Sequence, residues 1–195
     1  MVSAIVLAAG SSRRMGNVNK LLLPFQDKTI IWHVVYNVLA AGLKEVIVVT
    51  GYESAAVNSA LEGLPVQFVF NKDHTSGMTT SIQRGVLQAQ GYGYMICLSD
   101  MVFISAEEYT AMAKNFATCA TSDKKTISLP VYNGQKGNPV IFSSFYRHAI
   151  LNHSEPEGCK AIIQSNADHL YLSAMATDHV LRDMDYIEQY TKLVT

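Results

Sequence analysis

The feature of this sequence that most constrains its fold is the apolar run near its start, which opens directly into a loop rich in glycine and serine. Residues 4–8 (AIVLA) are all apolar and include the β-branched Ile5 and Val6. A short apolar run of this kind is typical of a strand that is buried on both faces of a parallel sheet. The run therefore indicates a sheet that other elements cover on both sides.

The loop that follows has the composition of an anion-binding segment. Residues 9–20 (AGSSRRMGNVNK) contain two glycines and the basic residues Arg13, Arg14 and Lys20, and no acidic residue occurs before Asp27. Glycines let the backbone approach a ligand, successive N–H groups can point toward it, and basic side chains supply positive charge. We therefore expect an anion site here, with an ordinary turn and solvated arginines as the alternative interpretation.

The spacing of the glycines excludes two common nucleotide-binding loops. A Walker loop needs four residues between its glycines and then Lys-Ser or Lys-Thr. Here five residues separate Gly10 from Gly16, and Asn17 follows. The dinucleotide motif G-x-G-x-x-G is absent as well. The anion site predicted for this loop is therefore of another kind.

Apolar runs and helical periodicities alternate along the rest of the chain. Further strands are predicted over residues 45–50, 66–70, 92–98, 126–131, 137–142 and 171–174, and helices over 29–41, 54–61, 106–117, 143–151, from about 78, and at the C-terminal end. This order predicts an α/β fold with a single doubly wound, mostly parallel sheet. Asn133-Gly134 is a hairpin signal between two late strands, so we expect a small antiparallel addition. One domain is expected over residues 1–195.

A second polar segment follows the third predicted strand. Asn71 opens it, Gly77 would let the backbone press against a ligand, and Thr79, Thr80 and Ser81 come at the start of the next helix. Hydroxyls and free N–H groups at a helix N-terminus favour polar or anionic ligands. Helix capping alone is the alternative interpretation.

Three carboxylates are candidates for a ligand site. Asp100 directly follows the strand predicted over residues 92–98, and the carboxyl ends of strands are where ligands bind in open α/β sheets. Asp100 would otherwise cap the next helix, although Ser105 is the better placed cap. Asp183 and Asp185 alternate along an extended segment, so they point in opposite directions and one of them can enter a site.

Composition limits the classes of partner. The 195 residues carry a net charge of −1 and are 49% hydrophobic, so a sizeable core is expected and no basic field points to a nucleic acid. No apolar run approaches the roughly 20 residues that span a membrane, so no membrane partner is expected. Cys97, Cys119 and Cys159 form no CxxC pair, which indicates reduced thiols and a cytoplasmic protein.

The segment from Leu7 to Lys20 resembles the signature loop of the MobA-like nucleotidyltransferases, LAAG-x-S-x-R-M-G followed after a few residues by Lys. Further matches to the family pattern occur at Asn71, Gly77, Met78, Ser81, Gly85 and Asp100. The resemblance covers nearly the whole chain, is strongest over residues 4–24 and is weak after residue 150. It implies the Rossmann-like nucleotidyltransferase fold of that family.

The resemblance also implies roles for individual residues. Arg14, Lys20 and Asp100 would be catalytic, with Lys20 reaching phosphates from an exposed position. Mg²⁺ would be held by Asp100 and Asp185, with Asp183 as the substitute. The nucleotide would contact Leu7, Ala8, Ala9, Gly10, Ser11, Ser12, Arg13, Arg14, Gly16, Lys20, Asn71, Gly77, Met78 and Ser81. An acceptor phosphate would attack the α-phosphorus of a nucleoside triphosphate (NTP) and release pyrophosphate.

Within the family, the chain is most similar to the molybdenum cofactor cytidylyltransferases, which join CTP to molybdopterin; the guanylyl branch typically has a second glycine where this chain has Ala9. The expected partners are CTP, a molybdopterin-type acceptor and a molybdoenzyme that receives the product. Val102 and residues 158–163 depart from the family pattern. Two alternatives therefore stay open: another small-substrate nucleotidyltransferase, using GTP or a sugar phosphate, and a non-catalytic chaperone that binds a nucleotide or cofactor.

Overall fold

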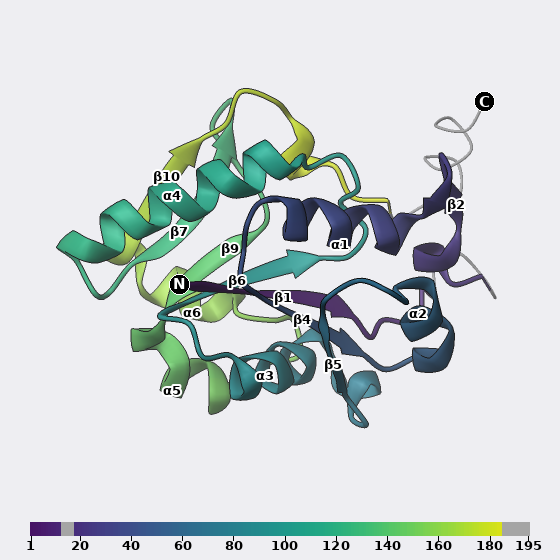
Figure 1. The fold of residues 1–195 in the computed structure, drawn as a ribbon. Coiled ribbons are helices and arrows are strands. Elements are labelled where there is room, and N and C mark those ends of the chain that lie inside the picture. The colour runs from purple at the N-terminus through teal and green to yellow at the C-terminus, as the bar shows by residue number, and fades with distance from the viewer. Residues whose placement is uncertain (13–17, 185–195) are drawn as a thin grey trace.

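The computed structural model of the chain describes residues 1–12 and 18–184, and its central element is an eight-stranded sheet (Figure 1). The strands lie in the order β10-β7-β9-β6-β1-β4-β5, with the short β8 paired to β7. Their bounds are β1 (Val2–Ala8), β4 (Glu45–Thr50), β5 (Gln67–Phe70), β6 (Gly93–Leu98), β7 (Ile127–Tyr132), β8 (Gln135–Lys136), β9 (Val140–Ser143) and β10 (Leu170–Ala174). A separate two-stranded sheet consists of β2 (Pro24–Phe25) and β3 (Lys28–Thr29).

Helices cover both faces of the large sheet. They are α1 (Ile30–Ala40), α2 (Ser54–Ala60), α3 (Met78–Gln88), α4 (Ala106–Ser122), α5 (Arg147–Leu151) and α6 (Lys160–Ser165). Five 3₁₀ helices are described as well: η2 (Lys20–Leu22), η3 (His74–Ser76), η4 (Ser144–Tyr146), η5 (Ala167–His169) and η6 (His179–Leu181). Figure 1 shows α1 and α4 on one face and α3, α5 and α6 on the other. No helix in the described part of the chain is long and apolar enough to cross a membrane.

Most neighbouring strands run parallel. β1 lies between β4 and β6 and is parallel to both, and β5 extends this part at one edge. β9 is antiparallel to β6 and to β7. β7 and β8 form a hairpin in which Asn133 and Gly134 have positive φ angles of 47° and 80°, as a two-residue turn of this type requires. The structure confirms the predicted α/β fold, with a doubly wound, mostly parallel sheet and a small antiparallel addition.

β1 is buried on both faces because its side chains alternate between two hydrophobic cores. Ala4, Val6 and Ala8 belong to the core that includes the buried residues of α1 and α4. Ile5 points the other way and belongs to the core beneath α3. The first strand therefore has the two-sided burial that its apolar run predicts.

Helix α3 lies close to β1 because Gly85 faces the strand. A Cβ atom at position 85 would overlap Cγ2 of Ile5, and Ile5 is fully buried with no room to move away. A glycine inside a helix costs about 1 kcal/mol relative to alanine. The close approach of helix and strand gives the physical reason for a glycine at this position.

Two helices differ from the expectation. α4 runs to Ser122, whereas the sequence predicts its end at residue 117 and a loop from residue 120. In this last part the hydroxyls of Thr118 and Thr121 donate to carbonyls four residues earlier, so polar side chains are accommodated within the helix. α6 is not predicted, and buried Ile162 anchors it to the core. The C-terminal helix expected after residue 185 lies outside the described residues.

We expect Gly85→Ala to lower the free energy of unfolding by about 1–3 kcal/mol, because overpacking against Ile5 outweighs the gain in helix propensity. Urea denaturation of the purified protein measures this change. Gln88→Ala, at an exposed position of the same helix, is the control and should change stability by less than about 0.5 kcal/mol. A Gly85→Ala variant as stable as the wild type would show that this contact does not limit the approach of α3.

Candidate active site

The carboxyl ends of β1 and β6 border a cavity of about 500 Å³. Parallel neighbours end at the same edge of a sheet, and this edge is where ligands bind in open α/β folds. The lining residues come from the end of β1 and its loop, from η2, from η3 and the start of α3, from the end of β6 and from the segment after η6: Leu7, Ala9, Gly10, Ser11, Ser12, Lys20, Leu21, His74, Thr75, Gly77, Met78, Ser81, Leu98, Ser99, Asp100 and Asp183. A Cβ atom at Gly10 would meet no atom of the described residues within 4 Å.

An ion pair joins Lys20 to Asp100 in this cavity. Nζ of Lys20 lies 2.5 Å from Oδ2 of Asp100, and the two side chains are only 15% and 14% exposed. Asp100 follows the end of β6, and Lys20 begins η2, so residues 80 positions apart in the chain are brought together. Lys20 is therefore not the exposed side chain that its place in a polar loop predicts, because Asp100 draws it into the cavity.

The ends of the basic loop are tied to each other and to the sheet. The backbone N–H of Lys20 donates to Oγ of Ser12 at 3.2 Å. The hydroxyl of Ser99 donates to the carbonyl of Leu7 at 2.6 Å, which links the ends of β1 and β6. Backbone and hydroxyl contacts thus hold Lys20 and Asp100 on one frame.

Asp100 also presents an atom that fits a cation. Its Oδ1 is buried and has no hydrogen-bond partner among the described residues. Asp183 lines the same cavity, and carboxylate oxygens are the ligands that Mg²⁺ prefers. Residues 1–12 and 18–184 contain no group of three or more His, Cys, Asp or Glu side chains that could hold a metal by themselves. The two carboxylates therefore suit an ion that takes its other ligands from phosphate oxygens and water.

The start of α3 forms another wall of the cavity, and the buried side-chain amide of Asn71 supports it through hydrogen bonds. Asn71 is fully buried, and its Nδ2 donates to Oγ of Ser81 at 3.0 Å and to Oγ1 of Thr80 at 2.9 Å. Ser81 lines the cavity, whereas Asn71 lies behind it. Asn71 thus orients a cavity side chain and is not itself at the cavity surface.

Gly77 and Thr79, near the start of α3, contact residues 155–158, whereas the sequence predicts that they face a ligand. Gly77 has a φ angle of 111°, and a Cβ atom there would lie 2.6 Å from the carbonyl oxygen of Pro156. The hydroxyl of Thr79 donates to the carbonyl of Glu155 and accepts from the N–H of Gly158 at 3.0 Å. The glycine and the hydroxyl therefore hold residues 155–158 beside the cavity wall, although Gly77 also lines the cavity.

The structure brings most of the predicted nucleotide contacts together. The ones that line the cavity are Leu7, Ala9, Gly10, Ser11, Ser12, Lys20, Gly77, Met78 and Ser81. Ala8 does not, because side chains alternate along β1 and its methyl group lies in the core with α1. Arg13, Arg14, Gly16 and Asp185 lie outside the described residues.

Five residues line the cavity without having been predicted: Leu21, His74, Thr75, Leu98 and Ser99. Ser99 directly precedes Asp100, so the prediction for the end of that strand could have included it. His74 and Thr75 lie within the polar segment between Asn71 and Gly77, where no spacing rule distinguishes a ligand contact from a loop residue.

Two of the three cysteines, Cys97 and Cys159, are buried thiols of low reactivity. All three are free thiols, as predicted. Burial raises the pKa of Cys159 to about 12 and raises the pKa of Cys97 further above its usual range. A thiol with a raised pKa carries little thiolate, which is the reactive form.

Comparison with known proteins relates the chain to a family of NTP transferases. Residues 4–170 match the family model of the MobA-like NTP transferase domain. The "nicotine blue oxidoreductase" of Paenarthrobacter nicotinovorans is 24% identical over 99% of this chain and 96% of its own length. The "probable molybdenum cofactor guanylyltransferase" of Methanosarcina acetivorans is 32% identical, but the alignment covers 54% of this chain and 48% of that protein.

Solved structures give the same relation in three dimensions. "A nucleotidyl transferase" from Methanothermobacter thermautotroptrophicus superposes with a TM-score of 0.86 at 25% identity, covering 99% of this chain and 95% of that one. Rv0371c from Mycobacterium tuberculosis superposes with a TM-score of 0.84 at 20% identity, covering 100% and 98% of the two chains. At that identity, the second match shows the fold alone.

We expect Lys20→Met to lower the free energy of unfolding by about 1–3 kcal/mol, between the values for exposed and fully buried ion pairs, because it leaves Asp100 without its cation. The double variant Lys20→Met/Asp100→Asn should lose less, since neither charge remains. Urea denaturation of both variants measures the difference. If the double variant is no more stable than Lys20→Met, the ion pair does not account for the loss.

Proposed function

The chain belongs to the MobA-like NTP transferase family, since the family model matches residues 4–170, and from this premise we propose a Mg²⁺-dependent transfer of a nucleoside monophosphate from CTP to a phosphorylated acceptor. The observation that carries the proposal is the pairing of Lys20 with Asp100 in a cavity at the carboxyl ends of β1 and β6. A cation for phosphate and a carboxylate for a metal ion thus lie side by side. One relative is named an oxidoreductase, so the relatives' names do not agree on one activity, and the proposal rests on these two groups.

The proposed reaction is an in-line displacement at phosphorus. An oxygen of the acceptor phosphate forms a bond to the α-phosphorus of the NTP, and the bond from that phosphorus to the oxygen bridging the β-phosphate breaks. Pyrophosphate leaves with the electron pair of the broken bond. Such a reaction depends on positioning and on neutralising charge, and no general base is needed because the acceptor phosphate is already ionised.

Lys20 would neutralise the triphosphate. Its ammonium group is placed at the cavity by the hydrogen bond from its backbone N–H to Ser12 and by its contact with Asp100. Gly10 would leave room for the phosphates to lie over the loop, since no atom of residues 1–12 and 18–184 lies within 4 Å of where its Cβ would be. Arg14, the other predicted cation, lies outside the described residues.

Mg²⁺, when bound, would neutralise developing charge on the phosphate oxygens. Asp100 and Asp183 would hold it among the described residues, and Asp185 is the alternative to Asp183. Oδ1 of Asp100 supports this assignment: it is buried and accepts no hydrogen bond from the part of the chain that the structure describes, which is costly for a carboxylate oxygen unless a cation is bound there.

Ala9 supports CTP as the nucleotide. An ideal Cβ at Gly51 would lie 2.9 Å from Cβ of Ala9 and 2.7 Å from Cβ of His74, so these three residues are closely packed. Ala9 and His74 both line the cavity. We propose that the Ala9 methyl group narrows the base pocket and favours a pyrimidine. Two Methanosarcina relatives, each aligned over about half of its chain and of this one, are named guanylyltransferases and point to GTP instead. The preference between CTP and GTP is therefore a matter for experiment.

For the acceptor we propose a molybdopterin-type phosphate, with a molybdoenzyme as the recipient of the product. The family resemblance and the molybdenum cofactor named for two relatives support it. Residues 155–158, which adjoin the divergent 158–163 segment, contact Gly77 and Thr79 beside the cavity wall. A sugar phosphate is the alternative acceptor, and it is distinguished by assaying pyrophosphate release with each.

CTP with Mg²⁺ is expected to raise the melting temperature more than GTP with Mg²⁺. A tenfold difference in affinity at saturating ligand corresponds to about 1.4 kcal/mol, which a thermal-shift assay resolves. Ala9→Gly should reduce the difference or reverse it, because it removes the methyl group from the base pocket. A larger shift with GTP in the wild type would overturn the cytidylyl proposal and leave nucleotidyl transfer intact.

Asp100→Asn is expected to lower the rate of pyrophosphate release with CTP and acceptor by at least about a hundredfold, the scale of losing one charge-stabilising group. Asp168→Asn, at an exposed position in η5, is the control and should retain the wild-type rate. A wild-type protein that binds CTP but releases no pyrophosphate with any acceptor would support the chaperone interpretation.

A further inference from the structure

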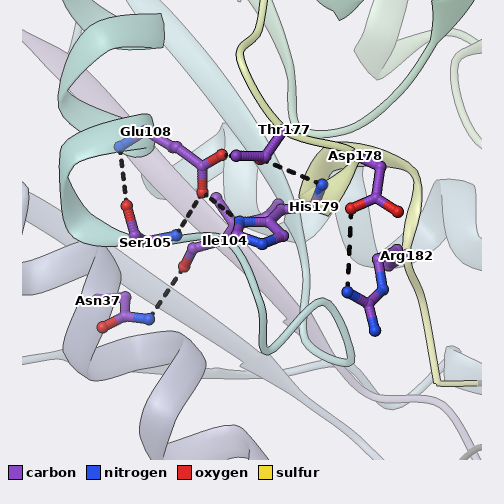
Figure 2. A network of polar contacts seen from close by, with 8 residues as sticks. All are labelled: Asn37, Ile104, Ser105, Glu108, Thr177, Asp178, His179 and Arg182. Carbon is purple, nitrogen blue, oxygen red and sulfur yellow. Dashed lines mark hydrogen bonds and ion pairs between the residues drawn. The ribbon is translucent and has the colours of Figure 1, made fainter. Parts of the chain in front are cut away.

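Glu108 makes more contacts than its place in a helix cap requires. Its Oε2 accepts from the backbone N–H of Ser105 at 2.8 Å, while the N–H of Glu108 donates to Oγ of Ser105 at 3.3 Å, which completes a capping box at the start of α4. The same carboxylate accepts from the hydroxyl of Thr177 at 2.5 Å and faces Nδ1 of His179 at 3.0 Å. Figure 2 shows Glu108 between these partners, with Thr177 and His179 coming from the segment that follows β10.

The carboxylate suits this double role because it stays ionised. The Glu108 side chain is 14% exposed, and burial alone would raise its pKa. Hydrogen bonds from Thr177, from the Ser105 backbone and from His179 nevertheless leave the pKa of Glu108 below its usual value. An ionised carboxylate only accepts hydrogen bonds, so Nδ1 of His179 carries the proton and donates.

The segment held by Glu108 is also fixed from its other side. Val180 is fully buried, and its carbonyl accepts from the N–H of Asn138 at 2.9 Å. Gly137 leaves room for this contact, because a Cβ atom there would overlap the Val180 carbonyl oxygen. The guanidinium of Arg182 lies over the ring of Phe103, 3.9 Å from its centre. Residues 177–182 are therefore packed in one position.

Asp100 and Asp183, the two carboxylates of the cavity, each adjoin one of the two segments that Glu108 connects. Asp100 lies at the start of the connection to α4, and Phe103 and Ser105 belong to the same connection. Asp183 follows Arg182 directly and lines the cavity that Asp100 lines. Phe103 touches the second segment through Arg182, and its ring centre lies 6.2 Å from that of His179. The segment after Asp100 and the segment before Asp183 are thus joined to each other through Glu108 and Phe103.

We propose that Glu108 is a positioning residue that fixes Asp183 relative to Asp100 by tying Thr177 and His179 to the start of α4. The proposal rests on the proposed function only in taking Asp100 and Asp183 as the carboxylates that hold the metal ion. Glu108 itself touches no ligand. Its effect reaches the cavity through the backbone of residues 177–183.

The test uses two double variants and a capping control. Thr177→Val/His179→Leu removes both donors to Glu108, whereas Thr177→Ser/His179→Asn keeps a hydroxyl and an N–H at similar places. Ser105→Ala removes the hydroxyl that caps α4 but keeps the backbone N–H of residue 105 and the other two donors on Glu108. Substituting Glu108 itself would disturb both the cap of α4 and the contacts with Thr177 and His179, so the two effects could not be separated.

Two measurements report whether Glu108 still holds Thr177 and His179, and neither requires turnover. The first is hydrogen exchange of the Leu181 and Arg182 amides, which donate to the carbonyls of Asp178 and His179 at 2.8 Å and 3.2 Å. The second is the dissociation constant of Mn²⁺, measured by electron paramagnetic resonance in the presence of CTP. Asp183→Asn serves as the reference for losing the carboxylate itself.

We expect Thr177→Val/His179→Leu to speed exchange at both amides and to weaken Mn²⁺ binding at least about tenfold, the lower end of what losing an outer partner of a ligand costs. Thr177→Ser/His179→Asn should restore both readouts, and Ser105→Ala should leave Mn²⁺ binding unchanged. Wild-type Mn²⁺ binding by Thr177→Val/His179→Leu, alongside weakened binding by Asp183→Asn, would overturn the positioning role alone. Unchanged binding in Asp183→Asn would overturn Asp183 as a metal ligand, and the positioning role with it, and would leave Asp185 as the partner of Asp100.

Discussion

The two-sided burial of β1 is the constraint on which the rest of the structure depends. Its side chains alternate between the core shared with α1 and α4 and the core beneath α3. A strand in that position must be paired on both edges, and β4 and β6 supply the pairing in parallel. Parallel pairing in turn aligns the carboxyl ends of the strands. The basic loop after β1 and the carboxylate after β6 therefore lie at the same edge of the sheet.

The cavity at this place holds two charged side chains that are mostly buried. Lys20 and Asp100 are both mostly buried and lie 2.5 Å apart, so each offsets the cost of removing the other from solvent. A ligand that carries both a metal ion and phosphates can replace this pairing, because the ion suits the carboxylate and the phosphate suits the ammonium. The same two groups thus pair with each other in the protein by itself and, in the proposed function, would contact the metal ion and the phosphates.

Support for the cavity comes from residues that do not reach it. Asn71 orients Ser81 from behind, and Thr79 holds residues 155–158 against the start of α3. Glu108 joins the helix that follows Asp100 to the segment that precedes Asp183. These polar groups are buried or half-buried and have hydrogen-bond partners, which lets them fix the positions of their neighbours. Residues far apart in the chain are in this way combined around one site.

The sequence by itself determined most of the long strands and helices and the order in which they occur. The apolar run at residues 4–8, the helical periodicities and the Asn133-Gly134 turn are local patterns, and the fold class follows from their succession. The basic loop and Asp100 were also visible, since their composition and their place after buried strands are local features. The extension of α4 to Ser122 was missed because Thr118 and Thr121 have a polar composition typical of loops, although their hydroxyls bond within the helix.

Only the tertiary structure decided which groups meet. That Lys20 pairs with Asp100, that Gly77 makes room for Pro156, and that Glu108 holds Thr177 and His179 are contacts between distant parts of the chain. A local pattern gives the tendency of a segment to form a strand or helix and the face it buries. The partner of a polar side chain is set by how the whole sheet and its covering helices pack, and that packing is a property of the complete chain.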